Sequence, residues 1–203
     1  MPRSKPGSVR IDSGIWRGRN LKIAEIEALR PTKSIVRKTL FNWLRPILSG
    51  ARCLDVFAGT GVLGFESASQ GAQAVTFLEQ HTAAILDIQR NIDVFTGVDK
   101  SLNALAWSFP DPLPKSIEKP FDVVFMDPPF HQKQATIYID WVIHNQVMHQ
   151  DSLLYIEIGR GSLWPEIGGM KTYKYARSGG VQYGLLVLEN GRFQATSKPK
   201  GGS

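Results

Sequence analysis

Length and composition exclude several classes of protein. The chain has 203 residues, of which 42% are hydrophobic and 21% charged, and its single cysteine is Cys53. These values are typical of a globular domain and argue against a disordered or disulfide-stabilised chain. No apolar run approaches the ~20 residues of a membrane-spanning helix, and residues 1–10 lack the apolar stretch of a secretory signal. The four histidines are too scattered for a Cys/His zinc site, so we expect a metal-free protein of the reducing cytoplasm.

Positive charge is concentrated near the amino terminus. Residues 1–38 contain ten Lys and Arg against three Asp and Glu, a net charge of +7, whereas the whole chain carries +6. Clustered cations displace the counterions condensed on a phosphate backbone, so this segment predicts a polyanionic partner such as a nucleic acid. For residues 1–7 a solvated tail is the alternative. Trp16 and Leu21 lie between the later cations, which favours a folded segment there.

The first fifty residues predict a small β unit followed by a helix. Apolar and polar residues alternate at 9–11, 15–17 and 21–23 around two glycines, which is typical of a hairpin or meander. Thr32, directly after a proline, is expected to cap a helix whose apolar side chains recur at helical spacing to about Leu48.

Strands and helices alternate from residue 51 onward. Strands are expected at 53–57, 74–79, 101–107, 121–126 and 153–158, and helices at 62–70, 82–95 and 134–148. Helices of that length between short apolar strands imply βαβ units, and therefore a mostly parallel sheet with helices on both faces. Residues 170–176 and 183–189 predict a closing hairpin, and residues 196–203 a loose tail.

A glycine-rich segment, residues 55–64, follows the first of these strands and opens a helix. Gly59, Gly61 and Gly64 have the spacing that brings backbone and helix amides close to a ligand, and nicotinamide, flavin and adenosylmethionine proteins all use it. Asp55 favours the last of these, because a carboxylate repels a pyrophosphate but attracts the ammonium and sulfonium groups of S-adenosylmethionine. A tight turn without a ligand is the alternative.

An acidic residue, Glu79, ends the next strand. A carboxylate at that point can accept two hydrogen bonds from a ribose diol, which predicts a second contact to the same cofactor. A solvated acid at a strand end is the alternative.

The most specific element is the tetrapeptide Asp127-Pro-Pro-Phe130, which follows an apolar strand. Tandem prolines fix the backbone and remove two amide donors, so the Asp127 side chain and the nearby carbonyls are expected to face outward as rigid acceptors. Hydrogen bonds from an exocyclic amine to such acceptors favour its reactive, pyramidal geometry as positive charge develops. Phe130 would offer a face for an unstacked base. A strand-terminating turn is the alternative.

The glycine segment and this tetrapeptide together resemble the class I amino-methyltransferases. The flanking residues resemble one family in particular, the RsmD family of bacterial guanine-N2 methyltransferases of small-subunit ribosomal RNA. The similar segments are Arg10-Ile11, Gly14-x-Trp16-Arg-Gly-Arg19, Leu29-Arg-Pro-Thr32, Arg37, Thr39-Leu-Phe-Asn-Trp-Leu44 and Gly180-x-x-Tyr183.

The resemblance implies a Rossmann-like α/β fold with a mostly parallel, seven-stranded sheet and a small amino-terminal β-hairpin and helix extension. It implies an extension over 1–50, an adenosylmethionine-binding catalytic domain over 51–192 and a flexible tail over 193–203. The implied catalytic residues are Asp127, Pro128, Pro129 and Phe130. The implied cofactor-binding residues are Asp55, Phe57, Ala58, Gly59, Thr60, Gly61, Gly64, Glu79 and Ala104. The residues expected to contact RNA are Arg10, Arg17, Arg19, Arg30, Arg37 and Lys38.

One departure from the family concerns adenine recognition. The family commonly has Asn-Ala-Asp where this chain has Asn103-Ala104-Leu105, so backbone amides near Ala104 are expected to replace an acidic contact. The predicted protein is a monomer that uses S-adenosylmethionine, and its predicted partner is ribosomal RNA within the small subunit or its assembly intermediate.

Three other functions compete with this one. An N6-adenine DNA methyltransferase would use the same motifs, but such enzymes usually carry a target-recognition region for which this chain has no spare length. A noncatalytic RNA-binding assembly factor would keep the fold without needing intact motifs. A nicotinamide oxidoreductase would share only the glycine spacing.

Overall fold

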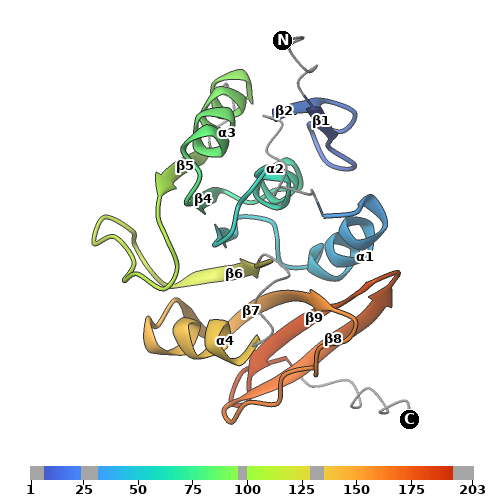
Figure 1. Ribbon diagram of the computed structural model, residues 1–203, viewed down its shortest axis with the longest axis vertical. Coiled ribbons are helices and arrows are strands. Elements are labelled where there is room, and N and C mark those ends of the chain that lie inside the picture. Colours follow the sequence, from blue (N-terminus) through green and yellow to red (C-terminus); the bar gives the residue numbers. More distant parts are fainter. Residues whose placement is uncertain (1–6, 24–31, 96–99, 129–134, 194–203) are drawn as a thin grey trace. The chain divides into compact units, whose positions relative to one another are not determined.

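The computed structural model describes residues 7–23, 32–95, 100–128 and 135–193, and the chain forms two compact units (Figure 1). Unit 1 is Met1–Asp111 and unit 2 is Pro112–Ser203. Residues 1–50 therefore share a compact unit with residues 51–111. The three predicted functional segments, over 1–50, 51–192 and 193–203, stay predictions.

The amino-terminal β unit of unit 1 is a two-stranded hairpin. Strand β1 (Gly7–Arg10) pairs with β2 (Asn20–Ile23) in antiparallel register, so that Val9 lies opposite Leu21. The predicted hairpin is confirmed and the alternative meander is wrong, because residues 15–17 form a turn between Gly14 and Gly18, whose φ angles are 80° and 84°. Two amides close the turn, that of Gly18 donating to Ile11 and that of Ile11 to Arg19.

This loop docks on the end of a helix in the body of unit 1. The helix is α2 (Val62–Ser69), and its last residue accepts the Ile15 amide at its carbonyl and the Trp16 amide at its hydroxyl, at 2.8 and 2.9 Å. A Cβ at Gly14 would lie 2.0 Å from the Ser69 carbonyl oxygen. Glycine at 14 is therefore what lets the loop come close enough to donate to the last carbonyl of the helix.

The next helix, α1 (Ser34–Leu44), is shorter than expected. Lys33 occupies the position before its first turn and makes no side-chain cap, so the expectation that Thr32 caps the helix is wrong. Instead, the carbonyl of Thr32 accepts a hydrogen bond from Arg37 at 2.7 Å. The predicted apolar face is present, because Val36, Leu40 and Leu44 are fully buried at helical spacing.

Three parallel strands form the centre of unit 1, in the order β5-β4-β3. They are β3 (Arg52–Asp55), β4 (Ala74–Glu79) and β5 (Ser101–Ala106), with α2 and α3 (Thr82–Phe95) as the crossover helices. The registers place Leu54 opposite Thr76, and Thr76 opposite Asn103. The predicted cofactor-binding residues lie within a few residues of the carboxyl ends of these strands. Because the strands are parallel, those ends share one edge of the sheet.

The described residues of unit 2 form four strands and one helix. Strand β6 (Phe121–Met126) is parallel to β7 (Met148–Gly159), while β9 (Val181–Leu188) is antiparallel to β7 and to β8 (Met170–Ser178). Helix α4 (Ala135–His144) ends before Gln146, whose φ is 51°. Because the helix stops there, β7 begins five residues earlier than expected, at Met148.

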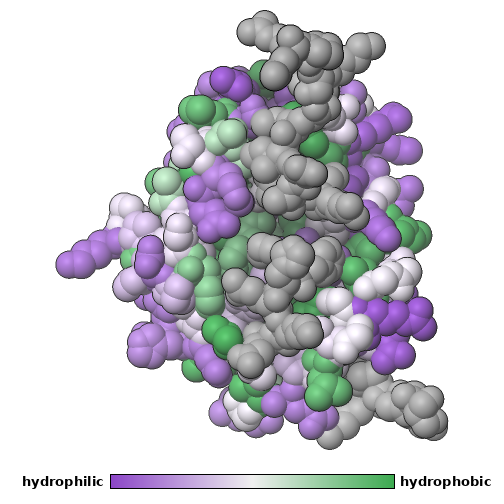
Figure 2. All heavy atoms as spheres, viewed as in Figure 1, coloured by the Kyte–Doolittle hydropathy of each residue, from purple (hydrophilic) through white to green (hydrophobic). Residues whose placement is uncertain are grey.

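The predicted fold class is confirmed, since the chain has the strands and helices of an α/β fold with a mostly parallel, seven-stranded sheet. Hydrophilic and hydrophobic side chains are interspersed over the coloured part of the face in Figure 2. No helix among the described residues is both long and apolar enough to cross a membrane.

Candidate functional site

The glycine segment forms a tight turn between β3 and α2. Gly59 and Gly61 have φ angles of 52° and 74°, and the Gly61 amide donates to Ala58 at 2.6 Å. A Cβ at Gly64 would lie 2.2 Å from the Phe77 ring on β4, so glycine is needed there for close helix–strand packing. The turn thus brings backbone amides and the amino end of α2 together at the carboxyl end of β3.

Asp55 holds this turn against the helix. Its side chain is 1% exposed, and its Oδ2 accepts the amide of Gly64 at 3.1 Å. The carboxylate therefore satisfies one of the amides that the first turn of α2 leaves without a helical partner. Its predicted attraction for the cofactor's ammonium and sulfonium groups stays a prediction.

Glu79 contacts the same turn from the end of β4. One carboxylate oxygen accepts the amide of Gly59 at 2.8 Å, and the other accepts the amide of His81 at 2.8 Å, with His81 Nδ1 at 2.7 Å. Glu79 is 6% exposed. The side chain is fixed in place by these contacts, and Oε2, which accepts only from Gly59, can accept a second hydrogen bond. Two elements expected to bind one cofactor are therefore in direct contact.

Three aromatic rings at the same edge of unit 1 include two that the motifs did not indicate. The Phe57 ring lies 6.5 Å from Trp107 and 5.8 Å from Phe109, and these two lie 6.1 Å apart. The Trp107 amide donates to the backbone carbonyl of Glu79 at 3.0 Å, which places Trp107 at the carboxyl end of β4. The sequence signal was the aromatic pair directly after β5.

Ala104 lies inside β5 rather than after it. It is paired with Phe77 of β4 and is half-buried, and the strand continues to Ala106. The residues at the carboxyl end of this strand are therefore Trp107 and Ser108. Whether the backbone near Ala104 contacts adenine stays a prediction. The remaining cofactor candidates, Ala58, Thr60 and Phe57, all lie in the turn, the first two buried and the third half-buried.

In unit 2, Asp127 and Pro128 follow β6 directly. Residues Val123 to Met126 are fully buried, Asp127 is half-buried and Pro128 is buried. The first two residues of the tetrapeptide therefore follow the carboxyl end of a buried strand, and their catalytic role stays a prediction. Pro129 and Phe130 lie outside the described residues.

Arg37, predicted to contact RNA, is instead a buried structural residue, and this corrects the prediction. Its side chain is 5% exposed, and its guanidinium donates to Asp12 at 2.7 Å and to the carbonyls of Thr32 and Arg10 at 2.7 and 3.0 Å. Its Nε lies 3.6 Å from the buried carboxylate of Glu66. A guanidinium committed to these partners is not available to a phosphate.

The other predicted RNA contacts are exposed where they are described. Arg10, Arg17, Arg19 and Lys38 are all exposed, and Arg30 lies outside the described residues. Arg19 is partly engaged, because its guanidinium lies 4.1 Å from the centre of the Phe95 ring and donates to Val94.

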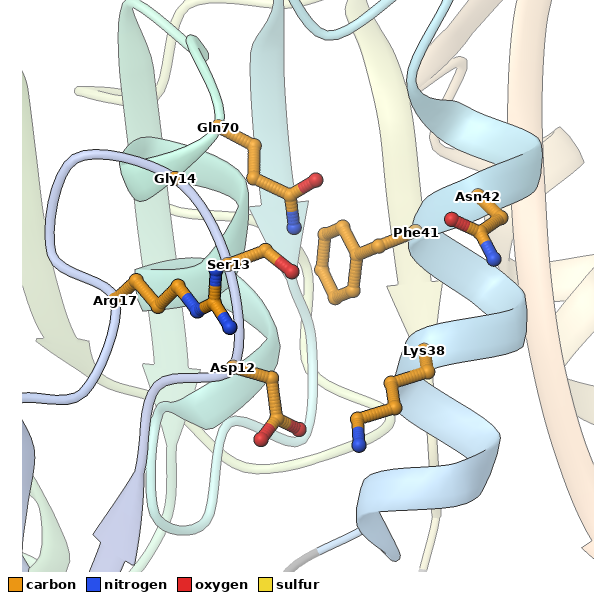
Figure 3. Close-up of a pocket in the computed structure, with 8 residues that line it drawn as sticks. All are labelled: Asp12, Ser13, Gly14, Arg17, Lys38, Phe41, Asn42 and Gln70. Atoms are coloured by element: carbon orange, nitrogen blue, oxygen red, sulfur yellow. The ribbon is translucent and has the colours of Figure 1, made fainter.

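Arg17 and Lys38 line one hollow of about 390 Å³ in unit 1. Figure 3 shows Arg17 on the hairpin loop and Lys38 on α1, with Asp12 between them and Phe41 at the wall of the hollow. Gln70, just after α2, and Asn42 also line it. Because Asp12 is already paired with Arg37, the two exposed cations dominate the local charge, which suits a phosphate group. Among the described residues, no group of His, Cys, Asp and Glu is placed to hold a metal ion.

Comparison with known proteins identifies the family. A family model described as conserved hypothetical protein 95 matches residues 9–187. Ribosomal RNA small subunit methyltransferase D of Haemophilus influenzae is 41% identical over 157 residues, which are 77% of this chain and 81% of that protein. A putative methyltransferase from Escherichia coli has a solved structure with a TM-score of 0.79 at 31% identity, covering 91% of this chain and 99% of that one.

A more distant structure shares the fold alone. It is a tRNA (uracil-54, C5)-methyltransferase from Pyrococcus abyssi in complex with S-adenosyl-L-homocysteine, with a TM-score of 0.57 at 15% identity, covering 91% of this chain and 45% of that one. The family model and the Haemophilus relative both span most of the chain, and on that basis the chain belongs to the RsmD family of methyltransferases.

Proposed function

We propose that this protein transfers a methyl group from S-adenosylmethionine to the exocyclic N2 amine of a guanine in small-subunit ribosomal RNA. The observation that carries the proposal is the glycine turn, which is held by two buried carboxylates in a chain whose relatives are named ribosomal RNA small subunit methyltransferases. An acidic acceptor at the end of β6 completes the set of groups that amine methylation needs.

The glycine turn suits S-adenosylmethionine better than a dinucleotide. Asp55 accepts the Gly64 amide at the start of α2, where its carboxylate would repel a pyrophosphate. Glu79 Oε2 can accept one further hydrogen bond from a ribose hydroxyl, and the amides at the amino end of α2 are close by. S-adenosylmethionine supplies, when bound, an electrophilic methyl group on a positively charged sulfur. A methyltransferase of the same fold was solved with S-adenosyl-L-homocysteine, which supports the choice.

Asp127 and the carbonyl of Pro128 are assigned to orient the target amine. The Asp127 carboxylate accepts from one amine N–H and the carbonyl accepts from the other, so the nitrogen lone pair turns out of the plane of the base. The amine nitrogen then attacks the methyl carbon in line with the bond to sulfur. Orientation of this kind lowers the barrier because little reorganisation is left at the moment of reaction.

The exposed cations of the amino-terminal segment are assigned to the RNA backbone. Arg17 and Lys38 flank a hollow that would take a phosphate, and Arg10 and Arg19 extend the basic surface of the same unit. Contacts of this kind position a substrate without reading its sequence. The modified base is accordingly selected by its place in the folded RNA.

The test is methyl transfer from labelled S-adenosylmethionine to ribosomal RNA from cells that lack this protein. Naked RNA and small subunits are offered separately, and the product nucleosides are separated by mass spectrometry. N2-methylguanosine in small-subunit RNA is the expected product. N6-methyladenine in DNA would instead identify the DNA-modifying alternative, and RNA binding without methyl transfer would identify an assembly factor.

A titration distinguishes the remaining alternative. The purified protein is titrated by calorimetry with S-adenosylmethionine and, separately, with NAD. Binding of S-adenosylmethionine and not of NAD is expected from the Asp55 carboxylate at the turn. The reverse result would identify a nicotinamide-binding protein and contradict the proposal.

A further inference from the structure

A second acidic residue, Glu157, lies beside Asp127 in unit 2. The last paired residues of β6 and β7 are Met126 and Ile156, so Asp127 and Glu157 are the next positions along the two chains. Two residues earlier, Phe125 and Tyr155 are partners whose rings lie 6.2 Å apart on one face. Since side chains alternate with a period of two, Asp127 and Glu157 follow on that face, on neighbouring strands about 4.8 Å apart.

Glu157 is held in place by a tyrosine. The Tyr155 hydroxyl donates to Glu157 Oε2 at 2.8 Å, and the two side chains are 0% and 4% exposed. On the other side, Tyr183 of β9 is the direct strand partner of Glu157 and is 2% exposed. The carboxylate therefore lies in a row between the residue that follows β6 and a buried tyrosine.

The cost of burying this carboxylate points to a function. A buried carboxylate loses the solvation of water, and well-packed apolar residues of similar volume are often as stabilising or more so. On the same face of β7, Leu153 and Tyr155 are buried. A charged group on this buried face, one step from a proposed catalytic residue, is the pattern of a site in which charge is arranged for chemistry.

The surrounding groups keep Tyr155 protonated and donating. Burial raises the pKa of the Tyr155 hydroxyl well above its ordinary value, and the negative charges of Glu157 and Asp127 raise it further. Both carboxylates therefore act on one hydroxyl. Helix α4, which packs against β7, carries Tyr138, whose pKa burial raises to about 12, and the exposed Asp140 and His144.

We propose that Glu157 is a positioning residue whose carboxylate, fixed by Tyr155, makes Asp127 a stronger proton acceptor during the methyl transfer proposed above, on which this inference rests. The nitrogen–methyl bond forms as the methyl–sulfur bond breaks, and the electron pair of the broken bond stays on sulfur. The methylated nitrogen then carries a positive charge and releases one proton to the Asp127 carboxylate. Glu157 remains charged throughout, and Asp127 returns the proton to water when the product leaves.

The negative charge of Glu157 should affect the pH dependence of methylation in a direction that can be measured. A like charge nearby disfavours the ionised form of a carboxyl group and raises its pKa. Asp127 must be ionised to accept from the amine, so the methylation rate falls on the acid side as Asp127 takes up a proton. Removing the neighbouring charge should make Asp127 a weaker base that stays ionised at lower pH.

The experiment measures kcat against pH at saturating S-adenosylmethionine and small-subunit substrate. For Glu157→Gln, the acid limb should move to lower pH by roughly one unit and the plateau kcat should fall about tenfold, with KM for S-adenosylmethionine changed less than twofold. Glu157→Asp keeps the charge but moves it away from Asp127, because its side chain is one methylene shorter. Its acid limb should therefore lie between those of Glu157→Gln and the wild type. The matched control is Tyr175→Phe, which removes a 2.8 Å hydroxyl bond to Gln182 in the same sheet and should keep the wild-type profile.

The outcomes separate this inference from the proposed function. An acid limb at the same pH in the wild type, Glu157→Asp and Glu157→Gln overturns the role of Glu157 while leaving the methyltransferase activity standing. A lower kcat with an unmoved limb and a lower melting temperature would show a purely structural carboxylate and also overturns it. If Glu157→Gln does not fold, Glu157→Asp alone decides by the direction of its limb. Wild-type protein that does not methylate the RNA refutes the proposed function, and this inference with it.

Discussion

Replacing Arg37 by alanine should greatly lower the free energy of unfolding, because Arg37 has a structural role and does not contact RNA. The guanidinium pairs with Asp12 of the hairpin loop and with Glu66 of α2, and it donates hydrogen bonds to two backbone carbonyls. Glu66 is 1% exposed, so the substitution would leave its carboxylate buried without the compensating cation. Breaking a buried ion pair in this way costs about 3–5 kcal/mol.

The loss should be visible as a lower melting temperature and should depend on pH. For a chain of this size, about 3–5 kcal/mol corresponds to a decrease of roughly 6–20 °C. Burial already raises the pKa of Glu66 above its ordinary 4.5, and the charge of Arg37 opposes that rise. Without Arg37 the folded-state pKa rises further. A carboxyl group whose pKa is higher in the folded than in the unfolded state favours folding at a pH below its unfolded-state pKa. This contribution is lost as the pH rises through its folded-state pKa. The loss of unfolding free energy caused by Arg37→Ala should therefore be larger at pH 7 than at pH 4.

Thermal and urea unfolding at both pH values measure this effect, with the exposed Arg17→Ala as the matched control. The control should unfold like the wild type, because the Arg17 side chain is exposed at the hollow of Figure 3. If Arg37→Ala lost less than about 1 kcal/mol, or lost RNA affinity at unchanged stability, the structural assignment of Arg37 would be refuted.

Further substitutions separate the proposed roles at the site. Asp127→Ala should lower kcat ten- to over a hundredfold with little change in S-adenosylmethionine affinity, since about 1.5–3 kcal/mol of charged hydrogen bonding is lost only in the transition state. Single-turnover rates measure the first effect and calorimetry the second. Normal turnover would remove Asp127 from the mechanism. Glu79→Ala should weaken S-adenosylmethionine binding by at least tenfold in calorimetry while RNA affinity in a filter assay is unchanged, because the side chain holds the turn at Gly59. Lys38→Ala should reduce the slope of log K for RNA binding against log salt concentration by about one, at an unchanged melting temperature. An unaltered slope would show that Lys38 does not contact the RNA backbone. Gly14→Ala should cost more than about 2 kcal/mol, since its Cβ meets the Ser69 carbonyl at 2.0 Å, whereas Gly50→Ala, at a similar φ of 75° with open space around it, should cost about 1 kcal/mol.

The chain's apolar periodicity was sufficient to locate most of the scaffold. The predicted bounds of β4, α3 and β6 match the structure, because strands and helices buried on the core carry period-two, continuous or helical apolar patterns that survive in any packing. Errors occurred where backbone geometry, not periodicity, decides. The turn at 15–17 depends on two positive φ angles and on docking against Ser69, and the start of α1 has no side-chain cap to reveal it.

The motifs indicated the glycine turn, Glu79 and Asp127 because the residue types that bind a sulfonium, a ribose or an amine are few and follow strands of a parallel sheet. They did not reveal that Glu79 supports the backbone of Gly59, or that Glu157 lies beside Asp127 with a tyrosine bonded to it. The contact of Glu79 with Gly59 joins residues 20 positions apart, and the place of Glu157 beside Asp127 depends on which strands pair.

Charge shows the same division most clearly. By sequence, Arg37 and Lys38 are adjacent cations in one basic segment, and both were assigned to RNA. In the folded chain one points to Asp12 and Glu66 and is buried, while the next is exposed. The sequence determines how many charges the segment carries and that they favour a polyanion. Only tertiary structure decides which of them meet buried carboxylates, because a helix turns each successive side chain by about 100° toward a different neighbour.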